Sequence, residues 1–183
     1  MSTTALVIVV ACVVVVPLAV AAVPVQQANR RRQLRLQFGP EHDRTVEATG
    51  GTKEAEIELR ARTQQRDKLN IRPLSAAQRD TYEQDWRQVQ ADFVDVPVQS
   101  LSRADTLVLS VMVGRGYPMQ DFDQQADLIS VDHPIVVDHY RRAHGIYLAT
   151  QSGPISTEQL RQAFISYRAL FEELLDERSS ATR

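Results

Sequence analysis

The 183-residue chain is 43% apolar and 24% charged, and its 21 basic and 23 acidic side chains give a formal net charge of -2. Seven Gly, eight Pro and one Cys exclude a collagen-like or disulfide-rich chain, and the apolar content excludes a wholly disordered one. The balanced charge gives no reason to expect nucleic acid as a partner. The length is typical of one domain.

The first predicted element is a membrane anchor within residues 1–27. Residues 5–25 contain no charged side chain, and a helix of this length spans about 31 Å, close to the ~30 Å hydrocarbon thickness of a bilayer. The run is rich in Val, which favours strands in water, but a lone strand in lipid would leave its backbone unpaired. We therefore expect one transmembrane helix. Ala19 and Ala21 also fit a signal-peptide cleavage pattern, so export after cleavage is the alternative.

A cluster of arginines follows the apolar run: Arg30, Arg31, Arg32 and Arg35. No Lys or Arg precedes the run, so the positive-inside rule places the C-terminal part of the chain in the cytoplasm. Arginines at this position also attract anionic lipid headgroups, by about 1 kcal/mol each. No aromatic side chain interleaves with them, which disfavours nucleic acid as a partner. The predicted location is the cell membrane, with a single pass and a cytoplasmic C-terminal domain.

Residues 28–70 are predicted to form a basic juxtamembrane segment and a polar stalk. A Gly-Pro step at 39–40 should end the helix that leaves the membrane, and a Gly-Gly step at 50–51 should end a second, short helix. Residues 53–69 have a helical pattern with too few apolar residues for a wide stripe, so we expect a mostly solvated stalk helix. Two like charges in it lie four residues apart and repel each other: Arg62 and Arg66.

Residues 71–176 are predicted to form a helical domain. Apolar residues recur there at helical spacing, and no alternating strand pattern competes with them. The predicted helices cover about 75–93, 97–113, 119–126, 131–150 and 156–175. We expect an all-α fold, a roughly four-helix bundle, followed by a disordered tail at 177–183.

Sequence signals at the helix starts refine this domain. Two capping boxes, Ser75 to Gln78 and Ser156 to Gln159, mark the beginning of the first and last helices. The helix before the last should begin with an N-cap at one of two residues and with a proline in its first turn: Asp132 or His133, then Pro134.

The sequence lacks a catalytic or metal-binding motif. His139 and His144 are five residues apart, so on a helix their side chains point about 140° apart and do not converge on one metal ion. There is no nucleophile elbow, P-loop, EF-hand or kinase signature. The single Cys12 lies in the apolar run. We therefore predict no metal, no cofactor and no catalytic residue.

A polar-rich region around two predicted turns is the candidate site. Its members are Arg115, Tyr117, Asp132, His133, Tyr140, Arg141 and His144. Such a set forms either the wall of a ligand pocket or a hydrogen-bond network between helix ends, and we favour the network because polar groups near caps usually satisfy the backbone. Asp105 lies beside an apolar helix face, where it is either a functional buried carboxylate or a boundary residue paired with an arginine or with backbone.

Several short motifs point to a known group of proteins. They are Phe38-Gly39-Pro40-Glu41 with Asp43-Arg44, Arg115-Gly116-Tyr117-Pro118, and Val131-Asp132-His133-Pro134 with Tyr140-Arg141 and Ala143-His144. On these motifs the chain resembles a family of small, uncharacterised, N-terminally membrane-anchored helical proteins from soil bacteria. The resemblance covers nearly the whole chain after the anchor. It implies an anchored helical protein and implies no activity.

The predicted function is a non-catalytic interaction or regulatory module at the inner face of the membrane, with lipid headgroups and a protein as partners. Two alternatives stay open. One is a small-ligand-binding protein or an enzyme that uses the polar region from Arg115 to His144. The other is an exported protein that is released by signal cleavage near Ala21.

Overall fold

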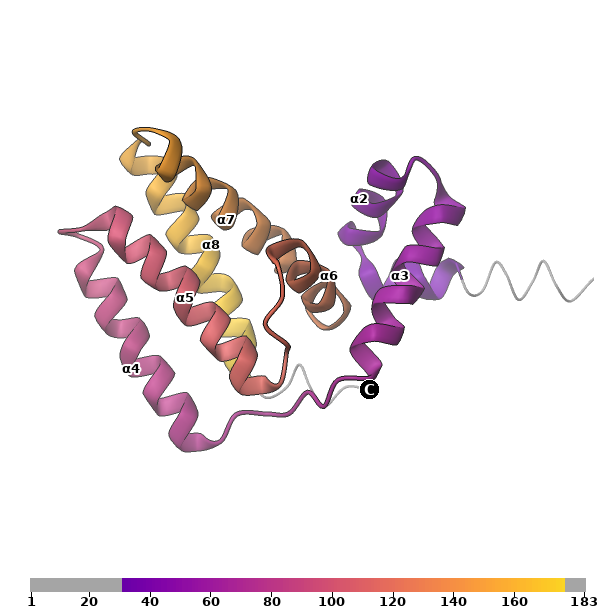
Figure 1. Cartoon of the computed structure of the whole chain (residues 1–183), viewed down its shortest axis with the longest axis horizontal. Coiled ribbons are helices and arrows are strands. Elements are labelled where there is room, and N and C mark those ends of the chain that lie inside the picture. Colours follow the sequence, from indigo (N-terminus) through magenta and orange to yellow (C-terminus); the bar gives the residue numbers. More distant parts are fainter. Residues whose placement is uncertain (1–30, 177–183) are drawn as a thin grey trace, which may run out of the picture. The chain divides into compact units, whose positions relative to one another are not determined.

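The computed structural model describes residues 31–176 (Figure 1). The chain divides into two compact units, Met1–Gln37 and Phe38–Arg183. Of the first unit the structure describes residues 31–37, which are helical and expose three of the four clustered arginines: Arg31, Arg32 and Arg35. The predicted membrane anchor, Arg30 and the predicted tail lie outside the described residues. Among the helices of residues 31–176, none has both the length and the apolar character to span a bilayer.

Every regular element of the described second unit is a helix. In chain order they are α2 (Pro40–Thr49), α3 (Thr52–Asp67), α4 (Ala76–Asp92), α5 (Pro97–Arg115), α6 (Phe122–Asp132), α7 (Val137–Ser152) and α8 (Thr157–Leu175). Residues 31–176 contain no β-strand. The all-α prediction is confirmed for this part of the chain, and each helix corresponds to a predicted one, although some boundaries differ.

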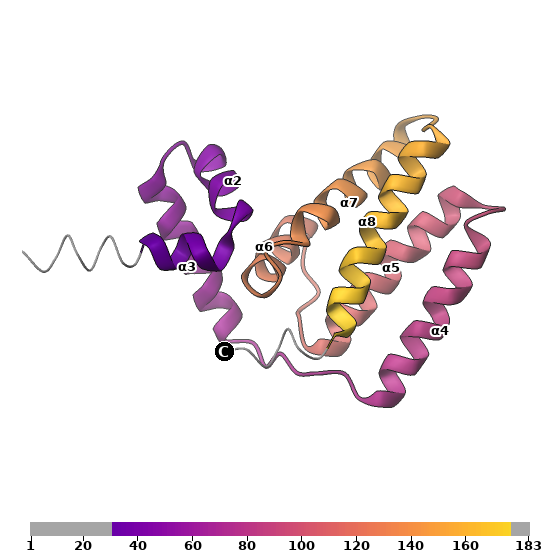
Figure 2. The ribbon, with the colours of Figure 1, turned by 180° about the vertical axis from the view of Figure 1, so that it is seen from behind.

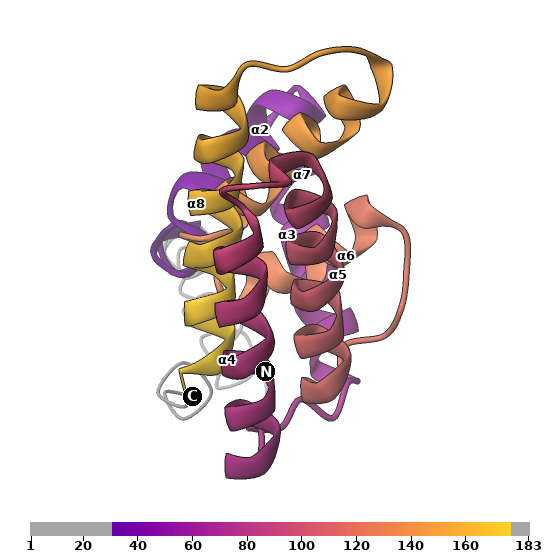
Figure 3. The ribbon, with the colours of Figure 1, turned by 90° about the vertical axis from the view of Figure 1, so that its left-hand side faces the viewer.

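The hydrophobic core lies between α4, α5, α7 and α8. Helix α8 packs against α5 and α7, and α4 packs against α5 (Figures 1 and 3). The helices meet through the apolar faces expected from their spacing, and several side chains there are at most 1% exposed: Leu101, Val108, Met112, Tyr140, Tyr167, Leu170 and Leu174. These four helices form the predicted bundle, and α6 packs against α7 at its side.

Helices α4 and α8 begin where the sequence predicts. The Ser75 hydroxyl accepts the backbone N–H of Gln78, whose side-chain oxygen accepts the backbone N–H of Ser75 at 3.1 Å. Ser156 and Gln159 make the same reciprocal pair, at 3.2 Å for the returning bond. Both capping boxes are confirmed, because each depends only on residues within one helical turn.

Helix α6 is longer and later than the predicted helix at 119–126. It begins after Asp121, whose carboxylate accepts the backbone N–H of Gln124 at 3.0 Å. It then continues through residues that the sequence analysis assigned to the start of the next helix, and it ends at Asp132. The side-chain cap at Asp121 fixes the start of the helix.

The boundary between α6 and α7 corrects a second prediction. His133 donates its backbone N–H to the Ile129 carbonyl at 2.8 Å, so it closes α6. The expected N-cap at Asp132 or His133 is therefore wrong. Pro134 disfavours helical backbone at the residue before it, and a turn follows until α7 begins at Val137. The proline ends one helix and does not start the next.

The predicted solvated stalk is also wrong for α3. The helix buries Ala55 and Leu59 completely, and it packs against α2 and α6 (Figure 2). The predicted break at the Gly-Pro step before α2 is confirmed, since Gly39 takes a φ of 48° directly after the helix that ends at Phe38. The apolar stripe of α3 is narrow, as predicted, but its arginines make ion pairs with distant helices.

Candidate functional site

Asp132, at the end of α6, joins three elements. Its carboxylate accepts the Nε–H of Arg66 in α3, with N–O distances of 2.8 and 2.7 Å, and the hydroxyl of Tyr117 at 2.7 Å. Burial, together with the Asp132 charge, raises the pKa of Tyr117 well above its usual value of 10, so the phenol stays protonated and donates. Tyr117 and Asp132 are thus two candidate residues that the structure brings together.

Arg141 of α7 belongs to a different group. Its guanidinium donates to both carboxylate oxygens of Glu41 in α2, at 2.6 and 2.9 Å. The Glu41 side chain is 1% exposed and also accepts from Arg62 of α3 at 2.9 Å. Asp127 of α6 lies 3.0 Å from Arg62 and 3.2 Å from Arg141. We call these four side chains, which come from four helices, the Glu41 network: Glu41, Arg62, Asp127 and Arg141.

The Glu41 network contains a fully buried carboxylate, Glu41, two largely buried guanidiniums, and a second carboxylate, Asp127, that is 30% exposed. Both arginines are 11% exposed. Burial raises the pKa of Asp127 above its usual 3.8, although the two guanidinium charges act in the opposite direction. Because buried charges are costly unless each is paired, this geometry fixes α2, α3, α6 and α7 against one another.

The sequence analysis identified Arg141 but missed its partners. Glu41 lies 100 residues before it, too far for any local pattern to connect them. One signal did point to this region, because Arg62 and Arg66 carry like charges one helical turn apart and only Arg62 has an acid, Glu58, one turn before it in the same helix. The structure supplies each of these arginines with a carboxylate from another helix.

Arg115 and His133 meet the C-terminal end of α8. The Arg115 side chain of α5 is buried, and its Nη1 donates to the Leu174 carbonyl at 2.8 Å. The His133 ring is fully buried, with its Nδ1 3.0 Å from a carboxylate oxygen of Glu173. The end of a helix carries unpaired carbonyls and partial negative charge, so a buried guanidinium at this position is favourable.

His144 and Tyr140, both on α7, contact the core. The His144 ring stacks on Phe122 with ring centres 3.8 Å apart, and its Nδ1 lies 3.5 Å from Asp105. Asp105 is buried and accepts the Tyr167 hydroxyl at 2.8 Å. Asp105 therefore contacts a phenol and an imidazole, where the sequence predicted an arginine or backbone. Burial raises the pKa of both tyrosines, so their hydroxyls stay protonated.

The seven candidate residues thus fall into four groups of contacts. Each of them touches another element of the fold, and four of them are at most 2% exposed: Arg115, Tyr117, His133 and Tyr140. The groups centre on Asp132 with Tyr117, on Arg141, on the end of α8 with Arg115 and His133, and on Asp105 with Tyr140 and His144.

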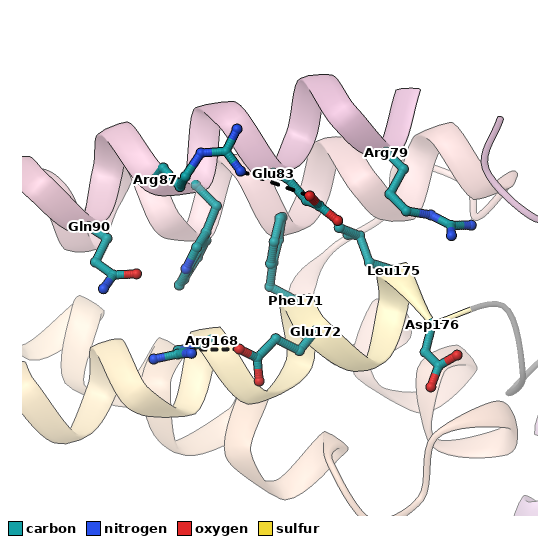
Figure 4. A pocket seen from close by; sticks show the side chains of 10 residues that line it. Arg79, Glu83, Arg87, Gln90, Arg168, Phe171, Glu172, Leu175 and Asp176 are labelled. Atoms are coloured by element: carbon teal, nitrogen blue, oxygen red, sulfur yellow. Dashed lines mark hydrogen bonds and ion pairs between the residues drawn. The ribbon is translucent and has the colours of Figure 1, made fainter. Parts of the chain in front are cut away.

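A groove of about 450 Å³ lies between α4 and α8, and we call it the α4/α8 groove (Figure 4). Its apolar lining is Trp86, Phe171 and Leu175. The Trp86 ring stacks between Phe164 and Phe171, with ring centres 5.2 and 4.6 Å apart. Polar side chains of both helices form its walls: Arg79, Glu83, Arg87, Gln90, Arg168, Glu172 and Asp176. The sequence analysis did not single out this groove, because it is created by two helices that are far apart in the chain.

Comparison of the chain with models of known protein families, with curated proteins and with solved structures gives no match. Within residues 31–176, no three His, Cys, Asp or Glu side chains are grouped as a metal site requires. A function for this chain therefore rests on its own residues.

Proposed function

We propose that the chain is a single-pass membrane protein whose helical domain lies at the cytoplasmic face and acts by binding another protein. One observation carries the proposal: an uncharged run at residues 5–25 is followed directly by four arginines at 30–35. The run has the length of a bilayer-spanning helix. The position of the arginines on its C-terminal side favours a cytoplasmic domain and contact with anionic headgroups.

The contacts of the helical domain support binding rather than chemistry as its role. Tyr117, Asp132 and Arg141 hold helices together through short hydrogen bonds. Side chains that already hydrogen-bond to other helices can contact a substrate only if these hydrogen bonds break and the helices separate. The α4/α8 groove, by contrast, presents aromatic and charged side chains without any rearrangement of the helices.

The motifs behind the family resemblance are part of the same contacts. Glu41 and Arg141 pair with each other, and Tyr117 pairs with Asp132. The residues that suggest an anchored helical family therefore connect helices to one another in this structure. We include membership of that family in the proposal.

The proposal is tested by the topology of the full chain in membranes. A C-terminally tagged protein is expressed in bacteria, and right-side-out vesicles are treated with protease. We expect the tag to be protected and the purified chain to begin at Met1 or Ser2. A digested tag, or an N-terminus near Ala22, would overturn the proposal in favour of an outward-facing or exported domain.

A matched pair of variants tests the role of the arginine cluster. Replacing Arg30, Arg31, Arg32 and Arg35 by Gln should expose the tag in part of the population, because the charge bias that orients the helix is lost. Replacing four exposed arginines of the helical domain by Gln should leave the tag protected: Arg72, Arg103, Arg142 and Arg161. Equal behaviour of the two variants would contradict the orientation by charge.

A further inference from the structure

We propose that the α4/α8 groove binds a short segment of a partner protein in which an acidic side chain lies next to apolar ones. This inference deepens the proposed function, because it names the surface and the chemistry of the partner. It rests on three features of the groove (Figure 4): a buried donor without an acceptor, an aromatic lining, and two arginines, one from each wall, at the same end.

The buried donor is the indole N–H of Trp86. Trp86 is 6% exposed, and its Nε1 has no hydrogen-bond acceptor among residues 31–176. Its ring stacks on Phe164 and on Phe171, and Trp86 is one of the residues that line the groove. A buried N–H that lacks an acceptor is unfavourable, and a carbonyl or carboxylate oxygen of a bound peptide would satisfy it.

The two arginines come from opposite walls. Figure 4 shows Arg87 of α4 and Arg168 of α8 at the same end of the groove, together with Gln90. Each arginine is paired with a carboxylate one turn away on its own helix, Glu83 at 3.9 Å and Glu172 at 2.7 Å. These pairs are exposed and therefore weak, so a carboxylate from a partner can compete with Glu83 or Glu172 for these guanidiniums.

The remaining lining selects among anionic partners. Phe171 and Leu175 line the groove with 3% and 8% of their surface exposed, so the apolar contact that they offer is small and suits a single Leu or Phe side chain next to the acid. Glu83, Glu172 and Asp176 also belong to the walls, so a polyanion such as nucleic acid meets repulsion along most of the groove. One acidic residue flanked by apolar ones matches both the cationic end and the aromatic lining.

The test uses the full chain in lipid nanodiscs, where both faces of the membrane are accessible. Random 12-residue peptides displayed on phage are selected on the wild-type protein. We expect enriched sequences with an acidic residue next to apolar residues. Synthetic copies should shift the emission of Trp86, which is the only tryptophan of the chain. Enrichment of basic sequences, or of none, would overturn the inference.

Matched variants locate the binding site. The double variant Arg87→Gln/Arg168→Gln should bind the selected peptides at least about tenfold more weakly, since two charge-assisted contacts are lost. The control is Arg142→Gln/Arg161→Gln, which removes equally exposed arginines that are also paired within their own helices. Trp86→Phe keeps an aromatic ring and removes the N–H, so it should weaken binding by a few-fold. Equal binding by the arginine double variant and its control would refute the site.

The outcomes separate this inference from the proposed function. Peptide binding in nanodiscs does not depend on which way the chain crosses a membrane. If the peptides bind but the tag is digested, the proposed binding at the groove stands and the cytoplasmic location is refuted. If the tag is protected but no peptide is selected, the anchored topology stands and the proposed binding at the groove is refuted.

Discussion

Glu41 shows how one buried carboxylate can organise several helices. It lies in the first turn of α2, and its two oxygens accept from Arg141 and Arg62, which belong to α7 and α3. Removing a charge from water is costly, and the cost is recovered only while every partner stays in place. The residue therefore links the packing of α2 to the position of helices formed much later in the chain.

Glu41→Gln should lower the free energy of unfolding by about 3 kcal/mol, because breaking a buried ion pair leaves its partners buried with uncompensated charge. The measurement is urea denaturation of the purified chain, followed by circular dichroism. The control is Glu158→Gln. Hydrogen bonds from Arg161 and Gln162 lower the pKa of Glu158 to about 2, but the group is fully exposed, so we expect no measurable change in the midpoint. A Glu41→Gln variant as stable as the control would contradict the role of the Glu41 network.

Asp127→Asn tests the electrostatics of the same network. Burial raises the folded-state pKa of Asp127 above 3.8, so the folded state binds this proton more tightly than the unfolded state does. The contribution of the carboxyl to stability is therefore largest at low pH and declines as the pH rises through a window that begins near 3.8. The stability of the wild type minus that of Asp127→Asn should fall as the pH rises above about 3.8. Urea titrations at several pH values measure it, and a difference that rises with pH would show that the guanidiniums outweigh burial.

The candidate residues illustrate what a sequence reveals at this scale. Arg115, Asp132 and Arg141 are recognisable as polar groups near helix ends, and the structure gives each a specific contact. Their partners come from elements that are 59, 66 and 100 residues away, so local spacing carries no information about them. The α4/α8 groove could not be predicted from the sequence for the same reason, because its two helices are far apart in the chain.

At the scale of elements, local signals predicted α4 and α8 well. Both have a capping box and an apolar face with regular spacing, and both of these are properties of a single helix. The predicted boundary between α6 and α7 was wrong because a proline such as Pro134 is compatible both with the start of a helix and with the end of one. The prediction that α3 is solvated was wrong because its packing depends on ion pairs with α2 and α6 and not on a wide apolar stripe.

Loss of either capping box should cost about 1 kcal/mol. Ser75→Ala and Ser156→Ala each remove the acceptor for the backbone N–H three residues later. Chemical denaturation gives the loss, and hydrogen exchange should be faster at Gln78 or Gln159, respectively. The control is Gln84→Ala at an exposed position within α4, for which we expect a change of only a few tenths of a kcal/mol. Unchanged exchange at Gln78 in Ser75→Ala would contradict the cap.

At the scale of the whole second unit, the segment between α3 and α4 is held against the end of α5. The backbone N–H of Arg72 donates to the Arg115 carbonyl at 2.8 Å. Gly116 follows with a φ of 103°, and a Cβ at this position would lie 2.5 Å from the Asn70 carbonyl oxygen. Only a residue without a side chain allows this close approach and this left-handed backbone.

Gly116→Ala should therefore destabilise the protein by more than about 1–2 kcal/mol, since the backbone strain and the contact with Asn70 add. Gly145→Ala is the matched control, because its Cβ would meet no described atom within 4 Å. There we expect a gain of roughly 0.5–1 kcal/mol from the better helix former in α7. Thermal unfolding of both variants measures the contrast, and equal melting temperatures would contradict the close approach.

The 100 residues between Glu41 and Arg141 also set an order of events during synthesis. A ribosome adds about 5–20 residues per second, so roughly 5–20 seconds separate the appearance of the two side chains. Glu41 of α2 can pair with Arg62 as soon as α3 has been made, but it acquires Arg141 only when α7 has been made. The part of the domain nearest the N-terminus is thus translated first, but its Glu41 network is complete only after α7, more than eighty residues later, has been made.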